Sequence, residues 1–231
     1  MAPISSRTID ARACVEHAGG MQWYGYDTID STNDEAKRLL QAGALTRTSV
    51  ITARGQTAGR GSQGRLWLSE HDAGLYMSVV HLPVGGQRLP LSDMFTRSAG
   101  AACAEALIAA YGLAIRIKPI NDLYLAGGKL GGILTESVIQ GDRALAVITG
   151  VGLNLRATAR PLGPHAWAPA TSLEATMDAE AFGALDPMAL ARLLAEAIDA
   201  QHQRVFAGDE AAVLARWRAL TLDAPPSDRG I

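Results

Sequence analysis

Two β-rich runs separated by a short turn constrain the fold of this chain more than any other feature. Residues 133–139 and 145–151 are each long enough for a strand, and Gln140-Gly141-Asp142 between them carries the residue types of a tight turn. Strands joined by so short a connection pair antiparallel, because a parallel pair needs a crossover of about a dozen residues or more. The sequence therefore predicts a sheet with antiparallel hairpins.

Strand and helix patterns alternate along the rest of the chain. Residues 22–27 and 48–53 are typical of strands and enclose a short amphipathic helix, which we expect to begin with a Thr32/Glu35 capping box and to stop at Gly43. Further strands are expected at 75–81, 114–117 and 123–125, and further helices at 92–111, 187–206 with Asp186 as its cap, and 209–220. We expect one α+β domain over residues 1–220, with a mixed, largely antiparallel β-sheet flanked by helices, and a tail at 221–231.

The composition is that of a globular protein and argues against several classes of function. Of the 231 residues, 48% are hydrophobic and 19% are charged, which excludes a disordered or collagen-like chain. The net charge of -2 lacks the basic excess of a dedicated nucleic-acid-binding protein. No apolar run approaches the roughly 20 residues that span a bilayer. The two cysteines, Cys14 and Cys103, lie far apart in sequence, so we expect a reducing, cytoplasmic location.

Residues 55–65 form the first candidate site. They contain four glycines, two arginines and no large apolar residue, so they cannot belong to the core. Glycine lets backbone N–H groups approach an anion, and Arg60 and Arg65 offer bidentate donors to it. The segment is neither a Walker loop nor a dinucleotide fingerprint, because the Gly-Lys-Ser/Thr of the first and the helix of the second are missing. A mobile loop without a ligand is the alternative.

Lysine is scarce in this chain, which draws attention to Lys118. Of the 21 basic residues only three are lysines, and Lys118 and Lys129 are close in sequence. Lys118 follows the expected strand 114–117, where its ammonium can meet a carboxylate or a phosphate, and an ion pair with Asp122 is the alternative. Farther along, the Gly-x-Gly in 150–154 could bring backbone close to a flat ligand. The five histidines lack the spacing of metal ligands, so no metal-binding residues are expected.

Four segments, taken in order, resemble the biotin protein ligases, with order and spacing that match from about residue 26 to residue 220. The segments are Asp30-Ser31-Thr32-Asn33, Gln56-Thr57-Ala58-Gly59-Arg60-Gly61-Ser62-Gln63-Gly64-Arg65-Leu66-Trp67, Lys118-Pro119-Ile120-Asn121-Asp122-Leu123-Tyr124, and Gly128-Lys129-Leu130-Gly131-Gly132-Ile133-Leu134-Thr135-Glu136. The resemblance implies a mixed sheet flanked by helices, akin to class II aminoacyl-tRNA synthetase catalytic domains. It also implies a reaction in two steps: biotin and MgATP give biotinyl-5'-AMP, and a specific lysine of a carboxylase's biotin carboxyl carrier domain then takes the biotinyl group.

The resemblance also implies, position by position, which residues form the site. The implied biotin contacts are Ser31, Thr32, Asn33, Gln56, Arg60, Gly61, Ser62 and Lys118, with Arg60 and Lys118 as the catalytic residues. Hydroxyl and amide groups suit the neutral ureido ring, and the two cations would balance charge as one anion attacks another. The implied lining of the adenylate pocket is Trp67, Gly132, Gly150, Gly152 and Asn154, covered by a loop at 155–163. For Trp67 an ordinary place in the core is the alternative.

The chain departs from the family pattern at three points. Ser62 stands where many members have a second arginine, and Pro119-Ile120 replaces the usual Trp-Pro. Third, we expect the chain to lack the small β-barrel that commonly follows the catalytic domain and the helix-turn-helix of the members that repress transcription. We therefore expect no DNA binding, as well as no membrane association, and leave a homodimer open. Two other functions also stay open: a lipoate or octanoate transferase that acylates a carrier lysine, and a non-catalytic biotinyl-adenylate binding module.

Overall fold

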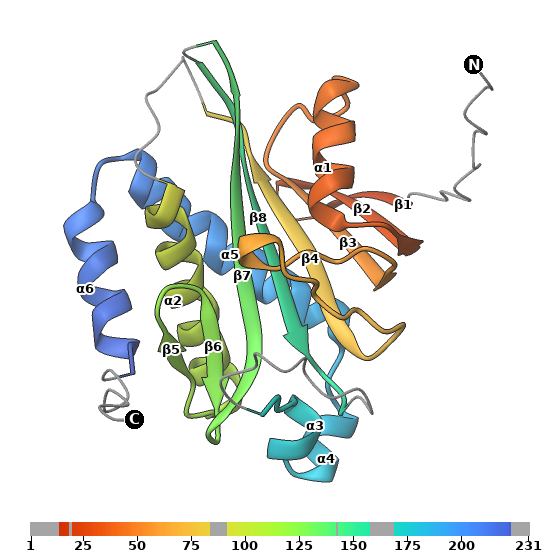
Figure 1. The fold of residues 1–231 in the computed structure, drawn as a ribbon, viewed down its shortest axis with the longest axis vertical. Helices are drawn as coiled ribbons and strands as arrows, with labels where there is room; N and C mark the ends of the chain where they lie inside the picture. Colours follow the sequence, from red (N-terminus) through yellow and green to blue (C-terminus); the bar gives the residue numbers. More distant parts are fainter. Residues whose placement is uncertain (1–13, 19, 84–91, 142, 158–168, 223–231) are drawn as a thin grey trace, which may run out of the picture.

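The computed structural model describes residues 14–18, 20–83, 92–141, 143–157 and 169–222, which form one eight-stranded β-sheet with helices on both faces (Figure 1). The strands are β1 (Cys14–Ala18), β2 (Met21–Ile29), β3 (Ser49–Gln56), β4 (Gly74–His81), β5 (Arg116–Lys118), β6 (Asp122–Leu125), β7 (Gly128–Gln140) and β8 (Arg143–Asn154). The helices are α1 (Thr32–Gln41), α2 (Ser92–Tyr111), α3 (Leu173–Thr176), α4 (Ala179–Gly183), α5 (Pro187–Phe206) and α6 (Glu210–Leu220), with a 3-10 turn at Ser62–Gly64.

The strand order across the sheet is β1-β2-β3-β4-β8-β7-β6-β5. Neighbouring strands are antiparallel except β2 and β3, which are parallel and are connected by α1. The hairpin expected around Gln140-Gly141-Asp142 is confirmed, and its strands are longer than expected, pairing from Gly131 opposite Leu153 to Gln140 opposite Arg143. The expected mixed, largely antiparallel α+β fold is confirmed.

Alternation along the strands gives the sheet two unlike faces. Leu75, Met77 and Val79 of β4 point into a core that they share with α2 and α5. Ser78 and Val80 point to the opposite face, where α1 packs against β3 and β4. Figure 1 shows α2, α5 and α6 on one side of the sheet and α1 on the other. The start of α1 lies over Ser78 of β4 and Gly150 of β8, and the loop that follows β3 places Trp67 over β7 and β8.

The two long helices have the bounds that the sequence predicts. Helices α2 and α5 coincide with 92–111 and 187–206, and Asp186 caps α5 by accepting a hydrogen bond from the backbone N–H of Met188 at 2.9 Å. Helix α1 stops before Gly43, as expected, and Gly43 has a φ of +67° that favours glycine after a helix. These ends are confirmed because local side-chain chemistry sets them.

The predicted capping box of α1 is wrong. Ser31 is the N-cap residue and its side chain makes no capping hydrogen bond, so Thr32 is already the first helical residue. The hydroxyl of Thr32 instead lies 2.8 Å from Ser78 Oγ and 3.3 Å from Gln56 Oε1, and Glu35 accepts a hydrogen bond from the Tyr26 hydroxyl at 2.7 Å. Both side chains are used by tertiary contacts that the local pattern could not reveal.

Other expectations differ at the ends of the chain and in the loops. Strand β1 and the short helices α3 and α4 were not expected, and Lys118 is the last residue of β5 rather than the residue after a strand. Leu222 N donates to Ile117 O at 2.8 Å, so the start of the expected tail is held against β5. Most of the predicted covering loop 155–163 and the tail from residue 223 lie outside the described residues. Within the described ranges, every helix is too short or too polar to cross a membrane.

A buried pair of histidines joins β4 to α5 and α2. His81 Nε2 lies 2.7 Å from Asp199 Oδ1, and His81 Nδ1 lies 3.2 Å from His202 Nδ1. On its other side, His202 Nε2 lies 3.2 Å from the carbonyl oxygen of Phe95. Burial, together with the neighbouring His81, holds the pKa of His202 well below its ordinary value.

The free energy of unfolding is expected to fall as the pH drops below about 6.5. Because the pKa of His202 is depressed in the folded state, the unfolded chain binds a proton there that the folded chain does not. Stability is therefore present above the unfolded pKa and is lost toward lower pH, by about 1.4 kcal/mol per pH unit for this group. Urea unfolding between about pH 7.5 and about pH 5.5 measures the slope. In the His202→Phe variant the slope of the free energy of unfolding against pH should be smaller by the contribution of about one proton. An unchanged slope would contradict the assignment of this contribution to His202.

Candidate active site

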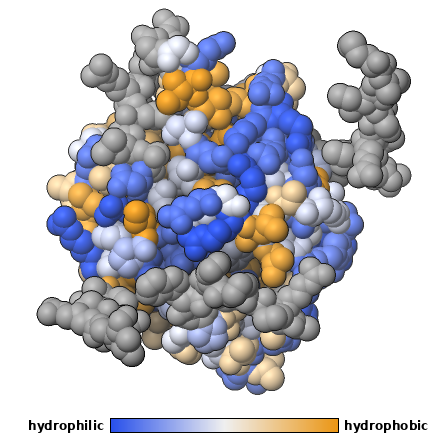
Figure 2. All heavy atoms as spheres, in the orientation of Figure 1, coloured by the Kyte–Doolittle hydropathy of each residue, from blue (hydrophilic) through white to orange (hydrophobic). Residues whose placement is uncertain are grey.

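The loop after β3 and the start of α1 meet over the middle of the sheet. Thr57 N donates to Ile29 O at 2.8 Å and Ala58 N donates to Asp30 O at 2.9 Å, which fastens the loop 57–67 to the segment that leads into α1. Figure 2 shows hydrophilic side chains gathered across the middle of this face, with hydrophobic patches beside them. The glycine- and arginine-containing segment thus lies against a sheet face and is built into the fold.

Three glycines on β7 and β8, the glycine bed (Gly132, Gly150 and Gly152), lie beneath this loop and α1. Gly132 is directly opposite Gly152 in the strand register. A Cβ atom at Gly152 would lie 2.5 Å from the indole ring of Trp67, and one at Gly150 would lie 2.5 Å from Asn33 Oδ1. Side chains at these positions would displace Trp67 and Asn33, so glycine is required here by close approach.

Four polar side chains form a hydroxyl–amide cluster: Thr32, Asn33 and Ser78, which are buried, and Gln56, which is half-buried. Ser78 Oγ lies 2.8 Å from Thr32 Oγ1 and 2.6 Å from Asn33 Oδ1. Gln56 Oε1 accepts a hydrogen bond from the backbone N–H of Thr32 at 2.9 Å, and Gln56 Nε2 donates to Ser69 Oγ at 2.7 Å. Ser78 is fully buried, and Thr32 and Asn33 are each 4% exposed. Such a cluster offers donors and acceptors, without net charge, beside the glycine bed.

Next to it lies an ion cluster of Asp34, Lys37, Arg60 and Glu136. Arg60 donates to both oxygens of Glu136, at 2.7 Å and 3.2 Å, and to Asp34 at 2.7 Å. Lys37 donates to Glu136 at 2.8 Å. Burial acts to raise the pKa of Glu136, but hydrogen bonds from Lys37, Asn33 and Arg60 outweigh it and leave the pKa below its ordinary value. Glu136 is therefore a carboxylate at neutral pH.

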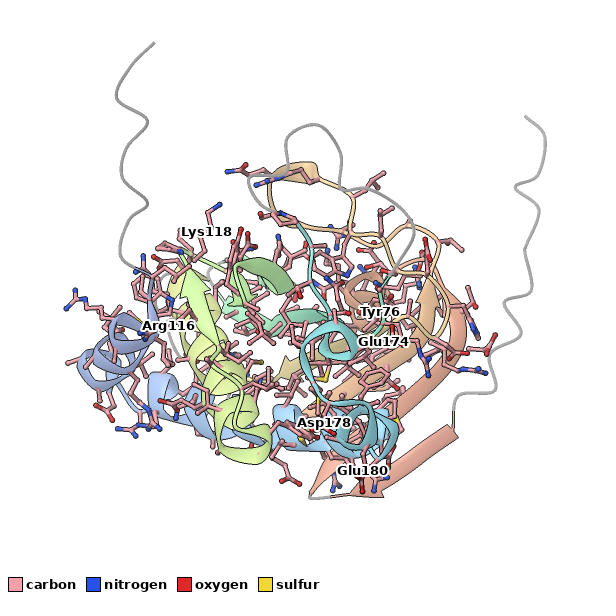
Figure 3. All side chains as sticks on the ribbon, turned by 90° about the horizontal axis from the view of Figure 1, so that it is seen from below. Tyr76, Arg116, Lys118, Glu174, Asp178 and Glu180 are labelled. Carbon is pink, nitrogen blue, oxygen red and sulfur yellow. The ribbon has the colours of Figure 1, made fainter. Side chains whose placement is uncertain are left out.

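The two lysines that the sequence singled out occupy different places. Lys129 Nζ lies 2.7 Å from Asp122 Oδ1 and 5.4 Å from the centre of the Trp67 ring, at the glycine bed. Lys118 ends β5, two strands away, with its Nζ 5.8 Å from the centre of the Tyr124 ring. Figure 3 shows Lys118 near Arg116 at one side of the molecule, away from Tyr76 of β4. Asp122 thus pairs with Lys129.

The predicted site residues fall into a gathered set and a separate set. Those gathered around the glycine bed are Ser31, Thr32, Asn33, Gln56, Arg60, Trp67, Gly132, Gly150 and Gly152. Gly61 and Ser62 lie farther out, where the loop turns, and Gly61 N donates to Arg65 O at 2.7 Å. Asn154 donates to the backbone oxygens of Lys129 and Thr171, at 3.2 Å and 3.0 Å, so its amide supports the backbone.

Sequence reasoning missed Ser78, Asp34, Lys37 and the role of Glu136. Ser78 had a signal, since it is the one small polar residue within the apolar strand expected at 75–81. Glu136 closed one of the matched segments but had no assigned role, because its partners lie 76 and 103 positions away in the chain.

Comparison with known proteins places the chain among ligases. The model of the Biotin/lipoate A/B protein ligase family matches residues 24–154. The biotin--[acetyl-CoA-carboxylase] ligase of Paracoccus denitrificans is 38% identical over 173 residues, which are 73% of this chain and 68% of that protein. The bifunctional ligase/repressor BirA of Bacillus spizizenii is 37% identical over 130 residues, and the match spans 56% of this chain and only 39% of the length of that relative.

Solved structures agree with the fold. The biotin protein ligase of Leishmania major in complex with biotin has a TM-score of 0.67 and 26% identity, covering 93% of this chain and 86% of that chain. The biotin protein ligase of Aquifex aeolicus in complex with biotin and ATP also has a TM-score of 0.67, at 24% identity, covering 87% of this chain and 78% of that chain. At this lower identity the likeness supports the fold alone.

Proposed function

Because the chain belongs to the biotin/lipoate A/B protein ligase family, we propose that it is a biotin protein ligase. It would activate biotin with ATP and transfer the biotinyl group to a lysine of a biotin carboxyl carrier domain. The carboxylate oxygen of biotin would bond to the α-phosphorus of ATP as pyrophosphate leaves. The carrier amine would then attack the acyl carbon as AMP leaves.

The observation that carries this proposal is the hydroxyl–amide cluster beside the glycine bed. The ureido ring of biotin is neutral and has both N–H donors and a carbonyl acceptor, so it needs a buried site with uncharged partners of both kinds. Thr32, Asn33 and Gln56 provide hydroxyl and amide groups, and Ser78 holds two of them from below. A lipoyl or octanoyl chain would instead need an apolar lining.

The cations near this cluster suit the first chemical step, in which one anion attacks another. We propose that Arg60 and Lys118 serve the carboxylate and the phosphate, as the resemblance implies, and that Lys129 joins them because it lies on the glycine bed. Mg²⁺ would enter with ATP, since it is usually held by substrate phosphates and one or two carboxylates. Asp122, the partner of Lys129, is the carboxylate beside Gly132.

The adenylate would lie against Trp67 and the glycine bed. Gly132 and Gly152 let the Trp67 ring lie directly on the strands, and the opposite face of an aromatic ring provides a surface on which a base can stack. The Trp67 ring rests directly over Gly152 and its Nε1 is buried without a hydrogen-bond partner, so the ring is in place for such a contact.

Pyrophosphate release from MgATP, with biotin, lipoate or no acid added, tests the proposed function. We expect release that depends on biotin, followed by labelling of a carrier domain. Release that depends on lipoate or octanoate would reverse the assignment toward the lipoate branch. Biotin binding without any release would instead support the non-catalytic binding module.

Ser62→Arg is expected to slow the escape of biotinyl-5'-AMP from the site. Ser62 begins the 3-10 turn of the loop, where many family members have a second arginine, and a guanidinium there could pair with the adenylate phosphate. Removal or addition of one charge-assisted contact typically changes affinity by about tenfold. Release of labelled adenylate into a filtrate measures the rate. If the variant and the parent release it equally fast, position 62 does not contact the adenylate.

A further inference from the structure

Every acceptor site of the Glu136 carboxylate is used by a donor from the candidate site. Oε1 accepts from Lys37 at 2.8 Å and from Arg60 at 3.2 Å. Oε2 accepts from Asn33 Nδ2 at 2.8 Å and from Arg60 at 2.7 Å. A carboxylate has about four lone-pair sites, so none is left for a substrate. The donors come from α1 and from the loop after β3, while Glu136 itself stands on β7.

Glu136 also sets the direction of the hydrogen bonds in the hydroxyl–amide cluster. A carboxylate can only accept, so the amide of Asn33 turns its Nδ2 toward Glu136, at 2.8 Å, and its Oδ1 toward Ser78; the same Nδ2 also makes a longer contact with the carbonyl oxygen of Leu134, at 3.4 Å. The single proton of the Ser78 hydroxyl then goes to Asn33, at 2.6 Å, which leaves the Ser78 oxygen free to accept from Thr32, at 2.8 Å. Glu136 thus sets the polarity of these buried groups through the shorter of the two contacts that Asn33 Nδ2 makes.

We propose that Glu136 is a positioning residue that fixes the Arg60 guanidinium and the hydrogen-bond polarity of Asn33 in the biotin site. The proposal rests on the proposed function, which supplies the ligand. It differs from a simple counter-ion role, in which Glu136 would only balance the positive charge that Lys37 and Arg60 leave over beside Asp34. A counter-ion competes with the ligand for Arg60, whereas a positioning residue helps the ligand to bind.

Glu136→Gln separates these two roles by the sign of its effect. Glutamine keeps the shape of the side chain but has one acceptor oxygen and one donor group, so it can keep about two of the four bonds and lets the Asn33 amide turn over. We expect the dissociation constant for biotin alone, measured by titration calorimetry, to rise about tenfold or more. Tighter binding would overturn the proposal, because it would show that Glu136 only competes for Arg60; unchanged binding would overturn it too.

Two further variants control for stability and separate the contributions of Arg60 and Asn33 to biotin binding. Glu105→Gln removes an equivalent bidentate pair with Arg216, at 3.0 Å and 2.7 Å, between α2 and α6 and outside the site. It should leave biotin binding unchanged, and an equal loss in both variants would overturn the proposal. Asp34→Asn disturbs Arg60 and Lys37 but not Asn33, so it should weaken binding less than Glu136→Gln does. An equal loss of biotin binding in Asp34→Asn and Glu136→Gln would show that the orientation of Asn33 does not contribute.

A second measurement is independent of the ligand. The side-chain amide signals of Asn33 in an NMR spectrum, assigned by their loss in Asn33→Asp, should be protected from solvent exchange in the parent chain. Protection should be lost in Glu136→Gln and kept in Glu105→Gln; protection that survives in Glu136→Gln would overturn the proposal. If the parent chain bound no biotin, the proposed function would fail while this comparison still tested the positioning.

Discussion

Alanine in place of Lys129 is expected to lower biotin-dependent pyrophosphate release by about 10²- to 10³-fold, the typical cost of losing one preorganised group that stabilises developing charge. The Lys129 ammonium lies 2.7 Å from Asp122 and beside the Trp67 ring, at the glycine bed where we propose that the adenylate lies. Its removal would also leave the Asp122 carboxylate without this partner, close to the phosphates. Both effects act against an anion in the site.

The effect of the unpaired Asp122 carboxylate can be separated from the effect of the lost Lys129 charge. Asp122→Asn, introduced into the Lys129→Ala chain, removes the repulsion without restoring the cation, so it should recover only part of the lost rate. Lys129→Arg keeps the charge but places a planar guanidinium where a compact ammonium stood. This variant should therefore keep only part of the parent rate. Full activity of Lys129→Ala would contradict the proposed role.

Lys118→Ala gives the comparison that measures how much each of the two lysines contributes. The sequence, through family resemblance, favours Lys118 as the charge-balancing group, and Lys118→Ala should then abolish most adenylation. The geometry puts Lys129 at the glycine bed and Lys118 two strands away, about 10 Å for strands spaced as in ordinary sheets. A large loss in Lys118→Ala with little loss in Lys129→Ala would leave Lys118 as the charge-balancing lysine and contradict the role proposed for Lys129.

The parts of the fold that were predictable are those with a strong local pattern. The β7–β8 hairpin follows from two β-rich runs around Gly141, and α5 follows from an apolar stripe and a capping aspartate. Strand β1 has five residues, and α3 and α4 are about one turn each, so none of them is long enough to show a period. Their places depend on packing partners that no local pattern contains.

The candidate site was predictable as far as motifs name its residues. Segments 30–33 and 56–67 come together, because the parallel pair β2 and β3 ends at one edge and the loop folds back over the sheet. The sequence could not show that Arg60 is held by Glu136 and Asp34, since ion pairs between distant segments depend on the register of β7 against the rest of the sheet. It also could not show which way the Asn33 amide faces.

Alanine substitutions at two glycines of β8 should affect the two substrates, biotin and ATP, differently. Gly150→Ala would place a Cβ 2.5 Å from Asn33 Oδ1, and Gly152→Ala would place one 2.5 Å from the Trp67 ring. Overpacking of this kind costs about 1–3 kcal/mol, which corresponds to a change of about 5- to 150-fold in an equilibrium constant. We expect Gly150→Ala to weaken biotin binding and Gly152→Ala to raise the KM for ATP.

The prediction is specific because each variant serves as the control for the other. Gly150 and Gly152 face the same side of β8, so a general disturbance of the sheet would affect both substrates in both variants. Gly100→Ala in α2 adds a neutral control, since its Cβ would only reach Ile117 Cδ1 at 3.8 Å, an ordinary contact. Steady-state kinetics with biotin and ATP varied in turn measure both constants. If Gly152→Ala raised the KM for biotin and left that for ATP unchanged, Trp67 and Gly152 would belong to the biotin site, and the proposed division of the glycine bed would be wrong.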